Sequence, residues 1–214
     1  MAYNVFGNPI TNTTLRGLPE YCEKQTITRT DKAHVALNGK KEGVKYENAR
    51  QHVQKLKEEW GVGVSTLCLI YNATGGPVYY VTSHNYLGHI GPAPYPQMIA
   101  NGQWAAFFHV KTTGELSGST AAVVYRGKNE AGQECDWMLG WSNPYDTNKW
   151  KNMVYTEIKE ANHFEDGSLW GSIADKMYQC GMFESGNWNG CVSYVSTESN
   201  TSPVFEATMT VKKA

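Results

Sequence analysis

A short segment of the sequence places aromatic residues among turn-forming ones. Tyr145 and Trp150 fall within residues 142–151, and Lys149 and Lys151 flank the tryptophan. The face of an aromatic ring attracts a quaternary ammonium group by cation–π interaction. Tryptophan and tyrosine also combine an apolar body with a polar tip, which suits membrane interfaces and the faces of sugars. An exposed aromatic between two lysines therefore predicts contact with a phosphate-bearing, partly apolar surface such as a lipid head-group layer.

No motif in the sequence predicts an enzyme. There is no G-x-S-x-G nucleophile turn, no H-E-x-x-H metal motif, no phosphate-binding loop and no dinucleotide fingerprint. His84 and His89 fall in a predicted loop over Ser83–His89, where they are expected to be surface residues. Asp166 and Asp175 lie near a predicted helix without a partner for acid–base chemistry. We therefore expect no catalysis, no cofactor and no bound metal.

The elements that must hold the aromatic segment are predicted to be short strands separated by turn residues. Many short strands at this spacing favour a β-sandwich or barrel, and high glycine and aromatic content agrees with a mainly β fold. The candidate strands are Val64–Asn72, Val78–Ser83, Gln103–Lys111, Ser119–Arg126, Cys135–Trp141, Val154–Lys159, Cys191–Ser196 and Phe205–Lys212.

Alternation within these strands predicts which side chains face the core between two sheets. Trp137 and Trp141 share one face of a strand and are expected in that core. The same inward orientation is predicted for Leu67, Leu69 and Tyr71 in one strand and for Val123 and Tyr125 in another.

Residues 1–62 differ from the rest and are predicted to form an N-terminal extension of short helices packed on the core, with the sandwich spanning 63–214. The main helix is expected over Lys45–Trp60, ending at Gly61. Its narrow apolar stripe and many charges favour packing on the core over insertion into a membrane. The stripe consists of Tyr46, Val53, Leu56 and Trp60.

Two further helices are expected. A short one is capped by Thr30 or Asp31 and ends near Gly39. Another lies near Ser168–Cys180, with Ser168 as its cap and Gly181 at its end. Its apolar face is formed by Leu169, Ile173 and Met177.

Composition excludes several classes of protein. With 19 Lys and Arg against 20 Asp and Glu, the formal charge of −1 argues against nucleic acid as a partner. No apolar run is long enough for a transmembrane helix. The N-terminus lacks the pattern of a secretory signal, so a cytoplasmic or leaderless-secreted protein is expected. The five cysteines are dispersed and expected to be mostly reduced and buried, with a Cys180–Cys191 disulfide left open.

At the aromatic segment the sequence resembles the actinoporin-like family. The run Ser142-Asn143-Pro144-Tyr145-Asp146-x-Asn148, followed by an aromatic residue and Val154-Tyr155, is similar to that family's Ser-Val-Pro-Tyr/Phe-Asp-x-Asn loop and next strand. Across the whole chain the sequence resembles the plant jasmonate-induced proteins and fungal nakanori group more closely. Segments 99–104, 122–127 and 135–139 carry that resemblance.

The resemblance implies an actinoporin-like two-sheet sandwich and recognition of phosphocholine head groups, sphingomyelin above all, in cholesterol-rich membranes. By position, the head group would contact Ser142, Pro144, Tyr145, Trp150, Thr120 and Trp170, with Lys149 and Lys151 at the membrane. The helix near Trp170 lacks most of the family's tyrosines, and the loop after Asn148 is shorter, with lysines in place of aromatics.

The combined prediction is a lipid-binding protein that docks peripherally on such membranes without perforating them efficiently. Two alternatives stay open. One is a carbohydrate-binding lectin of the fungal fruit-body type, since aromatic loops also stack on sugars. The other is a stress or defence protein with a protein partner. No oligomeric state is predicted.

Overall fold

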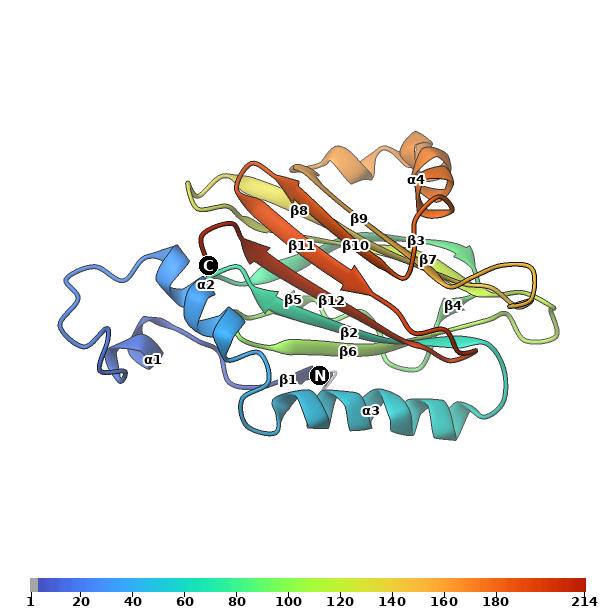
Figure 1. The fold of residues 1–214 in the computed structure, drawn as a ribbon, viewed down its shortest axis with the longest axis horizontal. Helices are drawn as coiled ribbons and strands as arrows, with labels where there is room; N and C mark the ends of the chain where they lie inside the picture. The colour runs from blue at the N-terminus through green and yellow to red at the C-terminus, as the bar shows by residue number, and fades with distance from the viewer. Residues whose placement is uncertain (1–3) are drawn as a thin grey trace.

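The segments rich in β-branched and aromatic residues form strands that assemble into two packed sheets with helices outside both (Figure 1). The structure is a computed structural model that describes residues 4–214. Its two sheets and flanking helices confirm the predicted mainly β sandwich.

The larger sheet, sheet A, is antiparallel except where β12 runs parallel to β2. Among the described residues its strands, in spatial order, are β1 (Val5–Phe6), β6 (Trp104–Val110), β2 (Ser65–Ala73), β12 (Val204–Val211), β11 (Cys191–Ser196) and β10 (Phe183–Trp188), with β4 (His89–Ile90) also pairing with β6.

The smaller sheet, sheet B, is antiparallel throughout. Its strands, in spatial order, are β5 (Met98–Ile99), β3 (Val78–Leu87), β7 (Ser119–Lys128), β8 (Glu134–Asn143) and β9 (Met153–Glu160).

Large aromatic side chains fill the core between the sheets. Trp137, Trp141 and Tyr125 from sheet B meet Phe107 and Phe205 from sheet A, and all five are fully buried. Trp141 lies 5.2 Å from Phe205 between ring centroids. The predicted core positions of the two tryptophans, and the inward face that Val123 and Tyr125 share, are therefore confirmed.

The prediction for β2 assigned the wrong face. Cys68 and Ile70 face the core between the sheets, whereas Leu67, Leu69 and Tyr71 face the helices outside sheet A. Because β2 is a central strand with helices on one side and a sheet on the other, all nine of its residues are buried. Alternation separates two faces of such a strand but does not tell which face meets which partner.

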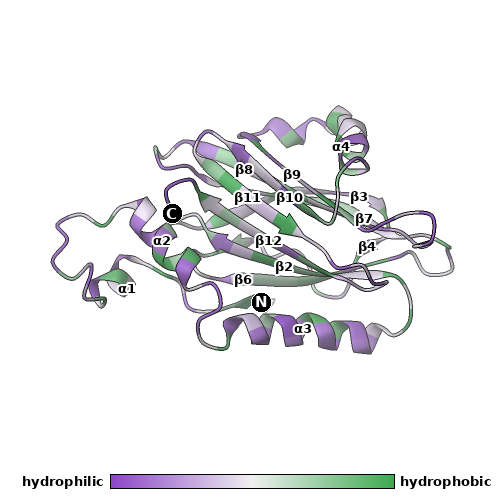
Figure 2. Ribbon diagram, viewed as in Figure 1, coloured by the Kyte–Doolittle hydropathy of each residue, from purple (hydrophilic) through white to green (hydrophobic). Residues whose placement is uncertain are grey.

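Helices α2 (Arg29–Asn38) and α3 (Lys45–Trp60) pack on sheet A, with α3 along the sheet, and α1 (Asn12–Arg16) lies beside α2 at one end of the molecule (Figure 1). The predicted bounds of α3 are confirmed. Tyr46 and Trp60 contact Trp104 and Phe108 of β6 at 5.1 and 5.8 Å between ring centroids. Figure 2 shows the mixed hydropathy of α3. Its apolar residues pack on the sheet, while most of its charged residues are exposed. The predicted division of the chain into an N-terminal extension over 1–62 and a sandwich over 63–214 stays a prediction.

The caps of two helices differ from the prediction. Thr28, not Thr30 or Asp31, caps α2, and Asp31 closes a reciprocal capping box with it. Before α4 (Trp170–Met177), Asp166 accepts a hydrogen bond from the Ser168 amide, so Ser168 is the capped residue rather than the cap. Helix α4 ends at Met177, with Tyr178 as its C-cap, rather than at Gly181.

Helix α4 and two short 3₁₀ turns, η1 (His163–Glu165) and η2 (Gly167–Leu169), cover the outer face of sheet B. Phe164, Trp170 and Ile173 pack there against Ala122, Val124 and Met138 of the sheet. Figure 1 shows α4 and α3 on opposite sides of the sandwich. Because α4 has only 8 residues, it covers only part of the sheet's length.

The expected loop over Ser83–His89 is wrong. Strand β3 continues to Leu87 by pairing with β7, and His89 belongs to β4. His84 stacks on Trp170 with ring planes 7° apart and centroids 5.0 Å apart. The strand pairing and the ring stacking both involve residues far away in the sequence, whereas the local residue types of this segment predict a loop.

All five cysteines are free thiols. Cys191 is buried in the core, whereas Cys180 is partly exposed after α4, where its thiol donates to the Lys176 carbonyl. The Cys180–Cys191 disulfide that the sequence left open is not formed in this structure.

Candidate head-group site

The candidate site is built on one row of residues that crosses four strands of sheet B. Strand register places Leu87 opposite Thr120, Thr120 opposite Ser142, and Ser142 opposite Met153. Alternation turns these side chains to the outer face, because their inward-facing neighbours such as Trp141 belong to the core. The row lies near the end of the sheet, and all four of its residues line one pocket.

Two hydroxyl groups form the polar floor of this pocket. Thr120 is fully buried and Ser142 nearly so, and their Oγ atoms lie 3.1 Å apart in a hydrogen bond. A hydroxyl can donate one hydrogen bond and accept two. Only one hydrogen is used between this pair, so when Thr120 donates to Ser142 the serine hydrogen remains. Ser142 is also the less buried of the two, so it is the hydroxyl that a ligand can reach.

Proline and aromatic side chains form the walls. Pro144 and Trp150 come from the β8–β9 loop, and Tyr178 comes from the end of α4. Trp150 is 61% exposed and Tyr178 is 46% exposed, so both rings are open to solvent. The cavity, which we call the head-group pocket, has a volume of about 370 Å³. None of its lining residues is charged.

Side-chain anchors hold the β8–β9 loop at both ends. Asn143 donates to the carbonyls of Ser65 and Thr201, at 2.7 and 3.1 Å. Asn152 donates to two carbonyls of the loop before β12, at 2.7 and 2.9 Å. Between these anchors the Trp150 amide donates to the Asp146 carbonyl at 3.0 Å, which closes a turn behind the ring.

Close approach of the β6–β7 loop supports the same region. At Gly118 an added Cβ would lie 2.4 Å from the Asn143 carbonyl oxygen and 3.1 Å from Pro144 Cα. Glycine is therefore required for this contact.

A neutral polar network lies beneath the row. His109 is fully buried between Ser119 and Asn85, with Nδ1 2.9 Å from the serine hydroxyl and Nε2 3.1 Å from the asparagine Oδ1. Burial, with a smaller contribution from His89, lowers the pKa of His109 to about 3. The imidazole is therefore neutral near pH 7, and it links β6, β3 and β7 without adding charge beneath the pocket.

The structure brings together four of the six residues proposed for the head group, and these are Thr120, Ser142, Pro144 and Trp150. Tyr145 lies on the other side of the loop, in a second cavity. Trp170 is buried beneath α4 against His84 and is not among the lining residues.

The two lysines that flank Trp150 are exposed at the same loop. Lys149 forms an ion pair with Asp146 at 3.6 Å, and Lys151 is exposed beside the tryptophan. Neither lines the head-group pocket.

Sequence reasoning missed Leu87, Met153 and Tyr178. Leu87 was hidden by the mistaken loop, and Met153 lies one residue before the predicted strand. Tyr178 could have been found from the sequence, because the corresponding helix of the actinoporin-like family bears tyrosines and Tyr178 is the C-cap of α4.

Among residues 4–214 no group of three or more His, Cys, Asp or Glu side chains is arranged to hold a metal ion. Within the same part of the chain, no helix has the length and apolarity that crossing a membrane requires.

The fold and the pocket together define a β-sandwich binding protein with an uncharged, aromatic-walled cavity at one end. Comparison with known families gives this class a name. The model of the Nakanori-like protein family matches residues 6–213, and the chain belongs to that family.

Individual relatives support the same family assignment. The 23 kDa jasmonate-induced protein of Hordeum vulgare is 42% identical over 174 residues, which cover 81% of this chain and 80% of that protein. A jasmonate-induced protein homolog of Atriplex canescens is 30% identical over 139 residues, covering 61% of this chain and 74% of that protein. The crystal structure of the lipid-binding protein Nakanori superposes with a TM-score of 0.87 and 31% identity, covering 96% of this chain and 98% of that one. The predicted relationship to the jasmonate-induced and nakanori group is confirmed.

Proposed function

We propose that this protein binds the phosphocholine head group of membrane lipids in the head-group pocket, with sphingomyelin in cholesterol-rich membranes as its target. The observation that carries the proposal is the convergence of Thr120, Ser142, Pro144 and Trp150 on one uncharged cavity. A zwitterionic head group has no net charge, so a neutral cavity avoids leaving a charge unpaired. A volume of about 370 Å³ is within the usual range for small-ligand sites.

The chemistry follows from the two ends of the head group. The choline ammonium would lie against the rings of Trp150 and Tyr178, where cation–π attraction favours it. The phosphate would accept a hydrogen bond from the Thr120–Ser142 hydroxyl pair. Tyr178 takes the part in this arrangement that the sequence had assigned to Tyr145.

The similarity to a solved lipid-binding protein supports lipid binding in general, and the similarity to jasmonate-induced proteins supports a stress or defence role. The choice of sphingomyelin and the dependence on cholesterol are the finer parts of the proposal. They rest on the resemblance of the Ser142–Tyr155 segment to the actinoporin loop.

Vesicle flotation tests this proposal. Vesicles of sphingomyelin, phosphatidylcholine and cholesterol in varied proportions should show strongest binding where sphingomyelin and cholesterol occur together. Trp150→Ala should weaken that binding by about 1–3 kcal/mol, as expected for loss of a cation–π contact in a binding site. Tyr79→Ala is the matched control, because this exposed ring lies at the other end of β3, outside the pocket.

Three results would count against the proposal. Equal effects of the two aromatic substitutions would mean that the pocket is not the site. Competition by free sugars would favour a lectin. Cell-surface binding that survives sphingomyelinase treatment would favour a protein partner.

We further propose that the bound protein does not perforate membranes efficiently. In actinoporins an apolar N-terminal helix detaches and crosses the bilayer, and α3 is the corresponding long helix in this chain. Its apolar residues are packed on sheet A, and its remaining faces carry seven charges, Lys45, Glu47, Arg50, Lys55, Lys57, Glu58 and Glu59. Each charge at the bilayer centre costs roughly 2.5–3.5 kcal/mol, whereas each large apolar residue contributes only about 0.3–0.6 kcal/mol. Dye-loaded sphingomyelin–cholesterol vesicles should therefore stay sealed at protein levels that saturate binding, and rapid leakage would contradict this.

A further inference from the structure

Two loops at the same end of the sandwich carry apolar residues at their tips. Val62, in the α3–β2 connection, is fully exposed, and Leu116, in the β6–β7 connection, is 80% exposed. Among residues 4–214 no other large hydrophobic side chain is as exposed as these two. Ser65 pairs with Val110, which places the α3–β2 connection beside the β6–β7 connection. Ser119 pairs with Asn143, which places the β6–β7 connection beside the β8–β9 loop.

A lysine lies at the base of each of these loops. Lys57 donates to the Gly63 carbonyl at 2.9 Å, and Lys111 donates to the carbonyls of Thr112 and Glu115 at 3.3 and 2.7 Å. In the described part of the chain neither amine forms an ion pair with a carboxylate. An ammonium group has three N–H donors, so each lysine retains at least one for a ligand.

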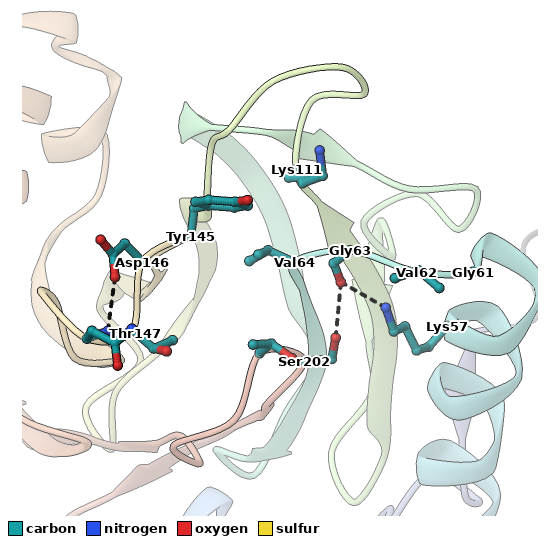
Figure 3. Close-up of a pocket in the computed structure, with 12 residues that line it drawn as sticks. Lys57, Gly61, Val62, Gly63, Val64, Lys111, Tyr145, Asp146, Thr147 and Ser202 are labelled. Carbon is teal, nitrogen blue, oxygen red and sulfur yellow. Dashed lines mark hydrogen bonds between the residues drawn. The ribbon is translucent and has the colours of Figure 1, made fainter.

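Both lysines line one cavity of about 640 Å³, separate from the head-group pocket. Figure 3 shows Gly63 and Lys57 on one side of this cavity and Tyr145, Asp146 and Thr147 on the other. Asp146 is already paired with Lys149 at 3.6 Å. The two lysine charges are therefore the uncompensated charges of the cavity, and its ligand should be an anion.

We propose that this cavity binds the phosphate of an anionic phospholipid, while Val62 and Leu116 enter the apolar layer beside it. This proposal depends on the proposed function in one respect, which is that the same end of the molecule faces the bilayer in both. Cations at phosphate depth with apolar side chains beyond them are the pattern of peripheral membrane-binding surfaces. A free phosphate would use the lysines but would leave both apolar tips in water.

The test compares vesicles of sphingomyelin and cholesterol with and without phosphatidylserine. Phosphatidylserine should strengthen binding of the native protein. The double variant Lys57→Gln/Lys111→Gln should lose that gain, by about fivefold for each lysine and roughly 25-fold together. The matched control is Lys128→Gln/Lys212→Gln, which removes the same charge from exposed lysines at the other ends of β7 and β12. Thermal unfolding of both variants checks that each is folded.

Equal losses in the two double variants would overturn the proposal, because net charge alone would then explain the gain. A second variant, Val62→Ser/Leu116→Ser, should lower affinity for vesicles with phosphatidylserine while leaving the lysines in place. If inorganic phosphate alone binds at the lysines as tightly as the vesicles do, and the apolar variant has no effect, the site is one for free phosphate and the lipid proposal is wrong.

The outcome also separates this proposal from the proposed function. Binding only to vesicles with phosphatidylserine would support the lysine site and contradict the choline pocket. Binding that needs sphingomyelin but ignores phosphatidylserine would contradict the lysine site and leave the choline pocket supported.

Discussion

The outer faces of the two sheets are covered to different extents. On sheet A, α3 extends over 16 residues and, with α2, buries Leu67, Leu69 and Trp104. On sheet B, α4 has 8 residues and covers Ala122, Val124 and Met138, leaving the row at Thr120 and Ser142 beyond its end. Where no helix covers this face, the β8–β9 loop and the end of α4 form the walls of a pocket and the sheet forms its floor. The difference in helix length therefore decides which outer sheet face is fully packed and which bears the head-group pocket.

The largest expected effect concerns the outer face of sheet A, which helices cover fully. Trp104 is completely buried, contacts Tyr71 at 4.9 Å between ring centroids, and donates its indole N–H to the Lys40 carbonyl at 2.9 Å. Trp104→Ala should lower the free energy of unfolding by about 3–5 kcal/mol. Urea unfolding measures this, while flotation of the folded fraction should show unchanged lipid affinity. A loss below about 1 kcal/mol would mean that the helix layer contributes little to the fold.

The second prediction concerns the covered part of sheet B. Trp170 is 7% exposed and stacks on His84, so Trp170→Ala should cost about 2–4 kcal/mol of stability. Lipid affinity should stay close to that of the native protein, in contrast to Trp150→Ala. Thermal melting and flotation on the same samples separate the two roles. Reduced affinity at unchanged stability would return Trp170 to the head-group site.

The third prediction uses pH to probe the network beneath the row. The pKa of His109 is about 3 in the fold but about 6.5 in an unfolded chain. Below about pH 6.5 the unfolded chain therefore binds a proton that the folded protein does not, and stability falls as pH drops toward 3. At about pH 5 this one residue should account for a loss of about 2 kcal/mol relative to neutral pH.

His109→Gln provides the comparison for this pH effect. Urea unfolding at about pH 7.5 and about pH 5 should show a smaller drop in the variant, because carboxylates titrate alike in both proteins. Parallel pH curves would mean that His109 is protonated within the folded protein.

The smallest expected effect comes from the row of residues that forms the floor of the head-group pocket. Thr120→Val keeps the shape of the side chain but removes the hydroxyl that pairs with Ser142. Lipid affinity should fall by about 1 kcal/mol if that pair binds the phosphate. Thr156→Val is the matched control, since this buried hydroxyl donates to the Met138 carbonyl, away from the pocket. Equal affinity of both variants for sphingomyelin vesicles would exclude the hydroxyl pair from the contact.

Much of the architecture could be predicted from local patterns. The bounds of α3 and β11 follow from apolar periodicity and from turn residues at their ends. Strand β10 was missed because Phe183–Trp188 contains glycine, serine and asparagine, which locally favour turns. Pairing with β11 along its whole length overrides that preference.

The sequence by itself determined most of the longer helices and strands, the tryptophan core and the loop motif, because each depends on spacing along a few residues. The loop motif also identified Ser142, Pro144 and Trp150 as candidates, since these residues are close neighbours in the chain.

Only the tertiary structure decided which of the candidates share a cavity. Register between separate strands aligned Leu87, Thr120, Ser142 and Met153, and the end of α4 delivered Tyr178. The turn at Asp146 separated Tyr145 from Trp150, so that two aromatic residues of one loop line different cavities. The physical reason is that alternation fixes which side chains lie on one face of a strand, whereas the partner that meets that face is chosen by contacts far away in the sequence.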